Sequence, residues 1–269
     1  MISKNQIKFI RQLEQKKFRR REGVFVAEGT KVVGDLLQHY HPNSIFATEE
    51  WLADNQGKWW RNQGYRSFDS ADSSNHESVH RIQVVTSDEL SRLSFQQHPQ
   101  QVLAIFPLPD PSHPFTFSPS HLSIALDGIQ DPGNLGTIIR IADWFGIRDI
   151  FCSEDTVDAW NPKVVQATMG SIARVNIIYI SLSKLIESLP DDFPVYGTLL
   201  DGENIYSQQL TSYGLIVMGN EGNGISPEIR QKVNHRLLIP SFRTDDTAES
   251  LNVAIATAIT CSEFRRQLL

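Results

Sequence analysis

Short apolar segments alternate with helix-patterned segments along most of the chain. Apolar side chains recur at helical spacing over residues 4–14, with Ser3 in position to cap that helix. Apolar runs that are rich in β-branched and aromatic residues predict strands over residues 23–29, 81–85 and 101–106. Strands and helices that alternate in this way predict a small α/β domain over residues 1–106.

A proline-rich stretch interrupts this pattern at residues 107–121. It contains five prolines and has no periodicity, so it predicts a linker. Over residues 122–269 short apolar strands alternate with helices again, which predicts an α/β domain with a mostly parallel sheet. The last helix is expected to begin at Leu251. It is rich in small residues, which favours close packing against another element.

Composition adds a prediction about the compartment. The two cysteines, Cys152 and Cys261, match no metal or redox spacing, which suits a reducing environment. The N-terminus has no apolar signal core, and no apolar run is long enough to span a bilayer. We therefore expect a soluble cytoplasmic protein with no membrane partner.

The charge of the chain is distributed unevenly. The formal net charge is −6, but the first 31 residues carry nine Lys or Arg against three Glu, a local charge of +6 on an otherwise acidic protein. A basic segment of this density predicts a phosphate-binding surface, whereas a solvated helix face is the simpler alternative. The candidate RNA-binding residues are Lys8, Lys16, Lys17, Arg19, Arg20 and Arg21.

Residues 76–80, HESVH, match the HExxH pattern of zinc peptidases. In those enzymes the motif lies on a helix, so that two His side chains one turn apart hold the metal. Here the motif follows a loop-like polar stretch and runs directly into a predicted strand. We therefore expect no metal site.

A glycine-rich turn follows a predicted strand at residues 215–226, LIVMGNEGNGIS. Gly219, Gly222 and Gly224 could be mistaken for a dinucleotide-binding loop, but too few residues follow to build that domain. The three glycines, which lack side chains, would let the backbone of this turn come close to a flat ligand, and Glu221 would lie at the rim of that binding site.

Two further segments place polar residues in apolar helices. Arg140 lies in the middle of a helix that begins beside Asn134, and a guanidinium there needs a partner. An exposed pair with Asp143 is the structural alternative. Near the last helix, Ser250 is a natural N-cap, whereas Asn252 in the first turn is harder to explain by structure alone.

Three motifs occur in a fixed order: NLGTIIRIA (134–142), IVMGNEGNGIS (216–226) and IP…ESLNVAIATAI (239–259). Together they resemble the motifs of the SpoU (TrmH-like) branch of the SPOUT methyltransferases. Residues 3–31 resemble the N-terminal RNA-binding domain that many of these enzymes carry. The resemblance implies a C-terminal domain with a trefoil knot and a homodimer through that domain.

The resemblance also implies methyl transfer from S-adenosylmethionine to a ribose 2′-hydroxyl in structured RNA, with ribosomal RNA as the leading substrate. A tRNA enzyme of the same family and a non-catalytic RNA-binding factor are the alternatives. The implied catalytic residues are Asn134, Arg140, Glu221, Ser250 and Asn252. The implied cofactor-binding residues are Leu199, Gly219, Asn220, Ile239, Pro240 and Leu251.

In this interpretation the partner of Arg140 is the incoming RNA, with Asn134 and Glu221 fixing the arginine and the adjacent loop. Arg140 would either accept the hydroxyl proton or stabilise the developing oxyanion. One segment departs from the family pattern: residues 241–249 form a longer loop that lacks the usual glycine. We therefore expect that loop to have a different geometry.

Overall fold

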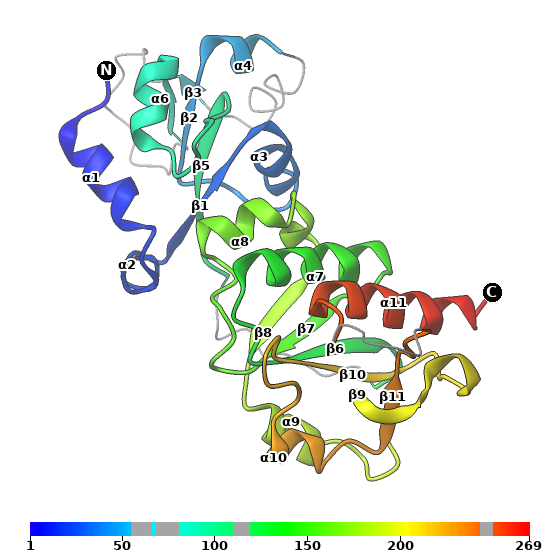
Figure 1. The fold of residues 1–269 in the computed structure, drawn as a ribbon. Coiled ribbons are helices and arrows are strands. Elements are labelled where there is room, and N and C mark those ends of the chain that lie inside the picture. Colours follow the sequence, from blue (N-terminus) through cyan, green and yellow to red (C-terminus); the bar gives the residue numbers. More distant parts are fainter. Residues whose placement is uncertain (55–65, 68–80, 110–118, 243–249) are drawn as a thin grey trace. The chain divides into compact units, whose positions relative to one another are not determined.

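The computed structural model describes residues 1–54, 66–67, 81–109, 119–242 and 250–269. Contacts between Cα atoms divide the chain into two compact units, both visible in Figure 1. Unit 1 comprises Met1–His113 and Trp160–Ala173, and unit 2 comprises Pro114–Ala159 and Arg174–Leu269. The segment Trp160–Ala173 therefore packs with the N-terminal unit, although it lies in the sequence range 122–269.

Unit 1 is built on a mixed five-stranded sheet with the strand order β1-β5-β2-β4-β3. Strand β5 runs antiparallel to β1 and β2, whereas β2, β4 and β3 run parallel to one another. The strands are β1 (Val24–Glu28), β2 (Ser44–Ala47), β3 (Arg66–Ser67), β4 (Arg81–Val84) and β5 (Val102–Pro107). The helical segments of this unit are α1 (Lys4–Gln12), α2 (Lys16–Glu22), α3 (Thr30–Leu36), α4 (Glu49–Ala53), α6 (Ser87–Leu93), α8 (Pro162–Ala167) and the 3₁₀ turn η1 (Ser171–Ala173).

Side-chain caps mark the starts of two helices of unit 1. Ser3 forms a capping box with Gln6 at the start of α1, which confirms the predicted cap, and Thr86 forms one with Glu89 at the start of α6. The basic run after α1 forms a second helix, α2. That helix ends at Gly23, whose φ of 65° lies in the left-handed region.

Unit 2 is built on a six-stranded sheet with the order β11-β9-β10-β6-β7-β8, and each of its strand pairs is parallel. The prediction of an α/β fold with a mostly parallel sheet is therefore confirmed. Its strands are β6 (Leu122–Asp127), β7 (Asp149–Cys152), β8 (Asn176–Tyr179), β9 (Val195–Asn204), β10 (Gly214–Gly219) and β11 (His235–Leu238).

Helices cover both faces of this sheet, with α7 (Pro132–Trp144) and α11 (Val253–Arg266) on one side and α9 (Leu182–Glu187) and α10 (Pro227–Arg230) on the other (Figure 1). A 3₁₀ turn, η2 (Ile205–Ser207), follows β9. Apolar side chains of α9 and α10 share one core cluster with β9 and β10. Helices α7 and α11 pack side by side.

The starts of α7 and α11 differ from the sequence prediction. Helix α7 begins at Pro132, two residues before Asn134, because Asp131 caps it through the Asn134 N–H and Pro132 occupies the first turn. Helix α11 begins at Val253 and is capped by Asn252. The alternative role of Ser250 as the N-cap is therefore wrong. In the described part of the chain, no helix combines the length and the apolar character needed to cross a membrane.

Candidate active site

The loops that follow the strands of unit 2 meet at one edge of the sheet. Strands β6 and β10 are parallel neighbours with Asp127 opposite Gly219, so the loops that follow them leave the sheet side by side. Beyond β6 the sheet continues with β7 and β8, and beyond β10 it continues with β9 and β11, so the strand order reverses at this pair. Open α/β sheets bind ligands at the point where the strand order reverses. Residues 128–131 and 220–224 form these two loops.

Hydrogen bonds join the two loops directly. The side-chain amide of Asn220 donates to the Gly128 carbonyl oxygen at 2.6 Å. The carboxylate of Glu221 accepts from the backbone N–H groups of Gln130 and Asp131, both at 3.3 Å. Since the carboxylate binds backbone N–H groups, it fixes the path of the first loop as well as its own position.

The same carboxylate is the start of a chain of side-chain hydrogen bonds. Asn134 donates through Nδ2 to Glu221 Oε1 at 2.9 Å, and Asn252 donates through Nδ2 to Asn134 Oδ1 at 2.9 Å. An ionised carboxylate only accepts hydrogen bonds, so Asn134 must turn its amide nitrogen to Glu221 and its oxygen to Asn252. Asn252 Oδ1 in turn accepts from Ala254 N at 3.0 Å. Three of the five predicted catalytic residues are thus bonded in a single network.

Glu221 is held in its charged form by this arrangement. Partial burial disfavours the ionised carboxyl, but hydrogen bonds from Asn134 and from backbone N–H groups, including those of Gln130 and Asp131, outweigh it. The pKa of Glu221 is consequently lower than the ordinary value for a glutamate.

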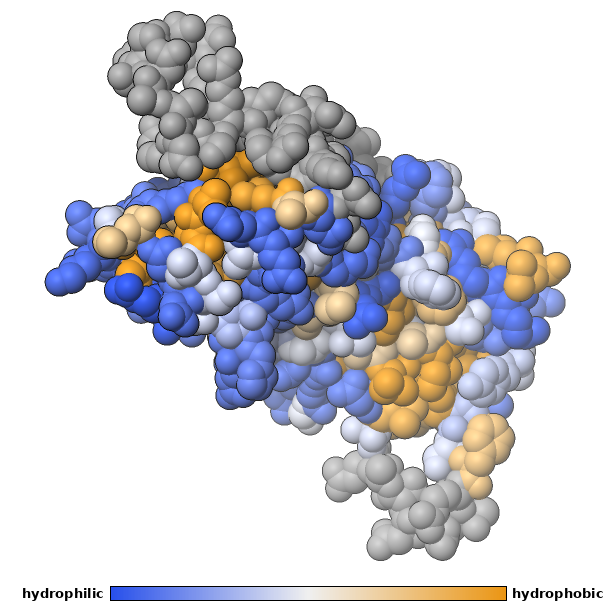
Figure 2. Space-filling view, turned by 90° about the horizontal axis from the view of Figure 1, so that it is seen from above, coloured by the Kyte–Doolittle hydropathy of each residue, from blue (hydrophilic) through white to orange (hydrophobic). Residues whose placement is uncertain are grey.

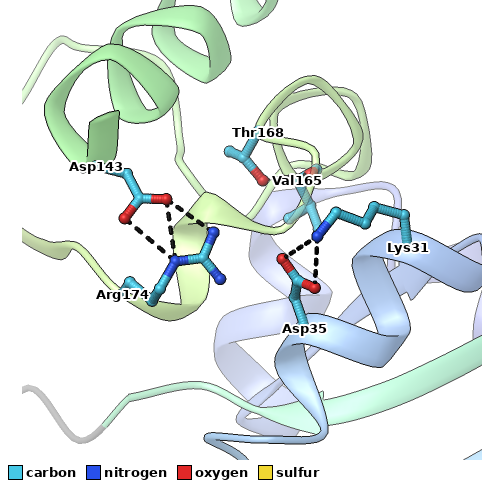
Figure 3. Close-up of polar contacts among 6 residues, drawn as sticks. All are labelled: Lys31, Asp35, Asp143, Val165, Thr168 and Arg174. Carbon is cyan, nitrogen blue, oxygen red and sulfur yellow. Dashed lines mark hydrogen bonds and ion pairs between the residues drawn. The ribbon is translucent and has the colours of Figure 1, made fainter. Parts of the chain in front are cut away.

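Arg140 lies outside this network. Its side chain is exposed on α7, and it forms no hydrogen bond or ion pair within the described residues. The structural alternative, a pair with Asp143, is wrong because Asp143 accepts from Arg174 at 2.7 Å (Figure 3). Asn134 and Glu221 fix the adjacent loop as expected, but neither bonds to Arg140: they bond to each other and to that loop.

A cavity of about 360 Å³ opens beside the network, within the range of about 300–1,000 Å³ that is usual for small-molecule sites. Five of the six predicted cofactor-binding residues line it: Leu199, Gly219, Asn220, Ile239 and Leu251. Glu221 and Ser250 also line it, whereas Pro240 is not among its described lining residues. The longer loop after Pro240 cannot be compared with the prediction, because residues 243–249 lie outside the described part of the chain.

The packing of the β10 loop on itself also requires glycines. A Cβ on Gly219 would lie 2.3 Å from the Gly224 carbonyl carbon and the Ile225 nitrogen. Gly224 has a φ of 69°, which favours glycine. Two of the three glycines are thus needed for the loop to pack on itself, whether or not a ligand approaches it.

The basic residues of unit 1 differ sharply in exposure. Lys8, Lys17, Arg20 and Arg21 are exposed, and Lys16 is half-buried. Arg19 is only 1% exposed, and its Nη1 donates to the carbonyl oxygens of Leu13 and Glu14, both at 2.7 Å. Its assignment as an RNA-binding residue is therefore wrong: the side chain joins α1 to α2 from inside the unit.

Three site residues were missed at the sequence level. Asp131 caps α7, Gln130 donates to the Asp155 carbonyl oxygen at 2.8 Å, and the buried Asp127 accepts from Ser226 N at 2.7 Å. Of these, Asp131 had a readable signal, because an aspartate directly before a proline is typical of a helix start. The other two depend on loop partners more than 20 residues away.

The described residues offer neither a metal-binding cluster nor a reactive thiol. They contain no group of three or more His, Cys, Asp or Glu side chains that could hold a metal ion. The HESVH motif at residues 76–80 lies outside them. Burial raises the pKa of both cysteine thiols, Cys152 and Cys261, so neither is an activated nucleophile.

The fold and the cavity define unit 2 as an open α/β protein with a cavity at the carboxyl edge of its sheet. The chain belongs to the SpoU rRNA methylase family, whose model matches residues 121–262, and residues 4–104 match the MRM3-like substrate binding domain. The family resemblance seen in the sequence is therefore confirmed.

Individual relatives agree over almost the whole chain. The 23S rRNA (guanosine(2553)-2′-O)-methyltransferase RlmP of Bacillus subtilis is 30% identical over 96% of this chain and 95% of its own length. A TrmH-family protein from Porphyromonas gingivalis has a similar structure, with a TM-score of 0.82 and 40% identity over 99% of each chain. An AdoMet-bound rRNA methyltransferase from Sinorhizobium meliloti has a TM-score of 0.79 and 28% identity over 100% of this chain and 97% of that one.

Proposed function

We propose that this protein transfers a methyl group from S-adenosylmethionine to a ribose 2′-hydroxyl of ribosomal RNA. The observation that carries the proposal is the position of the Asn252–Asn134–Glu221 network beside a cavity lined by five predicted cofactor-binding residues. The names of the relatives support ribosomal RNA as the substrate class.

The lining of the cavity fits the proposed cofactor. Leu199, Ile239 and Leu251 offer apolar walls, which suit the faces of an adenine ring. Leu200 and Leu251 line the cavity although they are 74% and 51% exposed, so a ligand there would cover apolar surface that the chain leaves in water. When bound, S-adenosylmethionine supplies a methyl group on a sulfonium, which is already a good leaving group.

Arg140 is proposed to contact the RNA substrate at the reacting ribose or its phosphate. It is an exposed cation without a protein partner in the described residues, so it can bind a ribose oxygen or a phosphate at no cost to an existing ion pair. A guanidinium stays protonated in proteins, which favours stabilisation of the developing oxyanion over acceptance of the proton. Water or a phosphate oxygen would then take the proton.

Asn134, Glu221 and Asn252 are proposed to hold the reacting groups in place. Their network ties the start of α7, the β10 loop and the start of α11 together. Catalysis by placement needs such rigidity, because small misplacements of the reacting atoms are costly. Ser250, which lines the cavity, would contact the cofactor or the ribose.

The exposed basic residues of α1 and α2 are proposed to bind RNA phosphates. Lys8, Lys17, Arg20 and Arg21 are exposed on a segment with a charge of +6, and Lys16 lies among them. Contacts of this kind position an RNA without reading its sequence.

A homodimer through unit 2 also belongs to the proposal. Apolar patches occur on the molecular surface (Figure 2). In unit 2, Trp144 on α7 is 85% exposed and Ile255 on the neighbouring α11 is 53% exposed. Large apolar side chains on adjacent helices favour a partner surface, and a second copy would cover them. The trefoil knot stays a prediction from the family resemblance.

The test is transfer of labelled methyl from S-adenosylmethionine to total RNA from cells that lack the gene, followed by nuclease digestion and nucleoside analysis. We expect label on a 2′-O-methyl nucleoside of ribosomal RNA. Label on tRNA would move the proposal to the tRNA enzyme of the same family. Absence of both cofactor binding and label would favour a non-catalytic RNA-binding factor.

A further inference from the structure

The cavity of unit 2 carries one charge of each sign in its described lining. Glu221 supplies the negative charge and Arg230, on α10, supplies the positive one. Glu221 is accounted for by its bonds to Asn134 and the loop that follows β6. Arg230 lies outside the three family motifs, and it lines the cavity without belonging to the network of Asn252, Asn134 and Glu221.

Arg230 shares its ion-pair partner with a second arginine. Its Nη2 donates to Oδ2 of Asp201, and Nη1 of Arg236 lies 3.4 Å from the same carboxylate oxygen. One carboxylate between two guanidiniums leaves a net charge of +1 on this cluster. Both Arg230 and Asp201 are exposed enough for water to weaken their attraction, with 39% and 51% of the side-chain surface accessible.

A guanidinium can hold two acceptors at once. It has five N–H donors in a rigid fork, and within the described residues Arg230 uses only Nη2. Its remaining donors are free for a ligand while Asp201 keeps the side chain in place. Arg236 provides a natural comparison, because it contacts the same Asp201 but lines a separate cavity, together with Tyr196 and His235.

We propose that Arg230 is a cofactor-binding residue that recognises the carboxylate of S-adenosylmethionine. This inference rests on the proposed function. The cofactor carries two positive groups, the sulfonium and the ammonium, and one negative group, the carboxylate. A cavity with one carboxylate and one guanidinium complements both signs, and it discriminates against ligands that lack the carboxylate.

The experiment measures binding by titration calorimetry for S-adenosylmethionine and for its decarboxylated analogue, which lacks only the carboxylate. Arg230→Gln should weaken binding of S-adenosylmethionine about tenfold to a hundredfold, the range for a lost hydrogen bond between charged groups. Binding of the decarboxylated analogue should be unchanged or slightly tighter, because that ligand has no carboxylate for Arg230 to bind and its two positive groups are repelled by the guanidinium. Arg236→Gln should change neither affinity by more than about threefold.

Several outcomes would overturn the inference. Equal weakening of both ligands, or the same effect from Arg236→Gln, would mean that Arg230 acts only through the local structure. A change confined to the KM for RNA would assign Arg230 to an RNA phosphate. Failure of the wild-type protein to bind either ligand would overturn the proposed function itself, which separates that case from a failure of the Arg230 assignment.

Discussion

Helices α2 and α7 each carry an arginine that the sequence assigned to RNA, and the two side chains have opposite surroundings. Arg19 in α2 is buried and donates to two carbonyl oxygens at the junction with α1. Arg140 in α7 is exposed and has no partner in the described residues. Its neighbour Asp143, the one nearby carboxylate that the sequence offered it, pairs with Arg174 instead.

The difference shows that the density of positive charge does not by itself identify a contact with RNA. Within the run KKFRRR, Arg19 faces inward while Arg20 and Arg21 remain exposed, although the three residues are adjacent. A helix rotates by about 100° per residue, so neighbours in sequence point in different directions. An arginine that is buried with its donors bonded to the protein, as Arg19 is, has a structural role, whereas an exposed arginine is available for a ligand and its position decides whether it meets one.

The largest effect is expected at Arg140. Arg140→Ala should lower the rate of methyl transfer about 100- to 1,000-fold, because it removes a donor that stabilises the developing oxyanion. The stability of this variant should stay within about 0.5 kcal/mol of wild type, since Arg140 is exposed and forms no hydrogen bond or ion pair with the described residues. The measurement is the single-turnover rate of methyl transfer together with the urea midpoint.

Arg148 supplies the control for that prediction. It is also an exposed arginine of unit 2 without a side-chain partner in the described residues, but it lies after α7, away from the network. Arg148→Ala should keep the wild-type rate within about threefold. A full rate in Arg140→Ala would remove the functional half of the comparison between the two arginines.

The next largest effect is expected at Arg19. Arg19→Ala should destabilise the protein by about 2–3 kcal/mol, because the carbonyl oxygens of Leu13 and Glu14 lose their donor and the aliphatic stem no longer packs. Urea unfolding followed by tryptophan fluorescence measures this change, and Trp51, buried in unit 1, is a suitable reporter.

Arg20→Ala is the matched variant for that prediction. Its side chain is exposed, so stability should change by less than about 0.5 kcal/mol. RNA affinity should fall, and the slope of log affinity against log salt concentration should become shallower by about one. If Arg19→Ala were as stable as Arg20→Ala and lowered RNA affinity in the same way, the buried position of Arg19 would be irrelevant to its role.

The same contrast explains how much the sequence could predict. Periodicity and capping are local, so the strands, the parallel sheet of unit 2 and the cap at Ser3 could all be predicted from the sequence. The inclusion of Trp160–Ala173 in unit 1 was not readable, because it depends on contacts such as Trp160 against Phe25, with ring centroids 4.6 Å apart.

In the site, too, the sequence could predict which residues matter but not which residues contact each other. The motifs identified Asn134, Glu221 and Asn252 as polar residues that need an explanation, and the structure joins all three. They could not say which residue bonds to which. Ser250 and Asn252 were equally good caps by residue type, and only the backbone path decides for Asn252.

The smallest effect is expected at Glu221, whose folded-state pKa is lowered by hydrogen bonds from Asn134 and the loop that follows β6. A carboxyl with a lowered pKa stabilises the fold above its unfolded pKa of about 4.3, and this contribution is lost as the pH falls through the folded value. Glu221→Gln removes the ionised acceptor. Wild type should therefore be more stable than Glu221→Gln at pH 7, by less than about 1 kcal/mol because the group is only half-buried.

The pH profile makes that small difference decisive. The stability advantage of wild type over Glu221→Gln should be constant from pH 7 to about pH 5 and shrink as the pH falls below about 4.3. Glu221→Gln should cost less stability at pH 7 in an Asn134→Ala background than in wild type, because Asn134→Ala removes the side-chain donor that favours the ionised carboxylate. An advantage that grows on acidification would mean that Glu221 is protonated in the folded protein. The network would then lack the fixed negative charge that sets the direction of the Asn134 amide and, through it, the placement of Asn252.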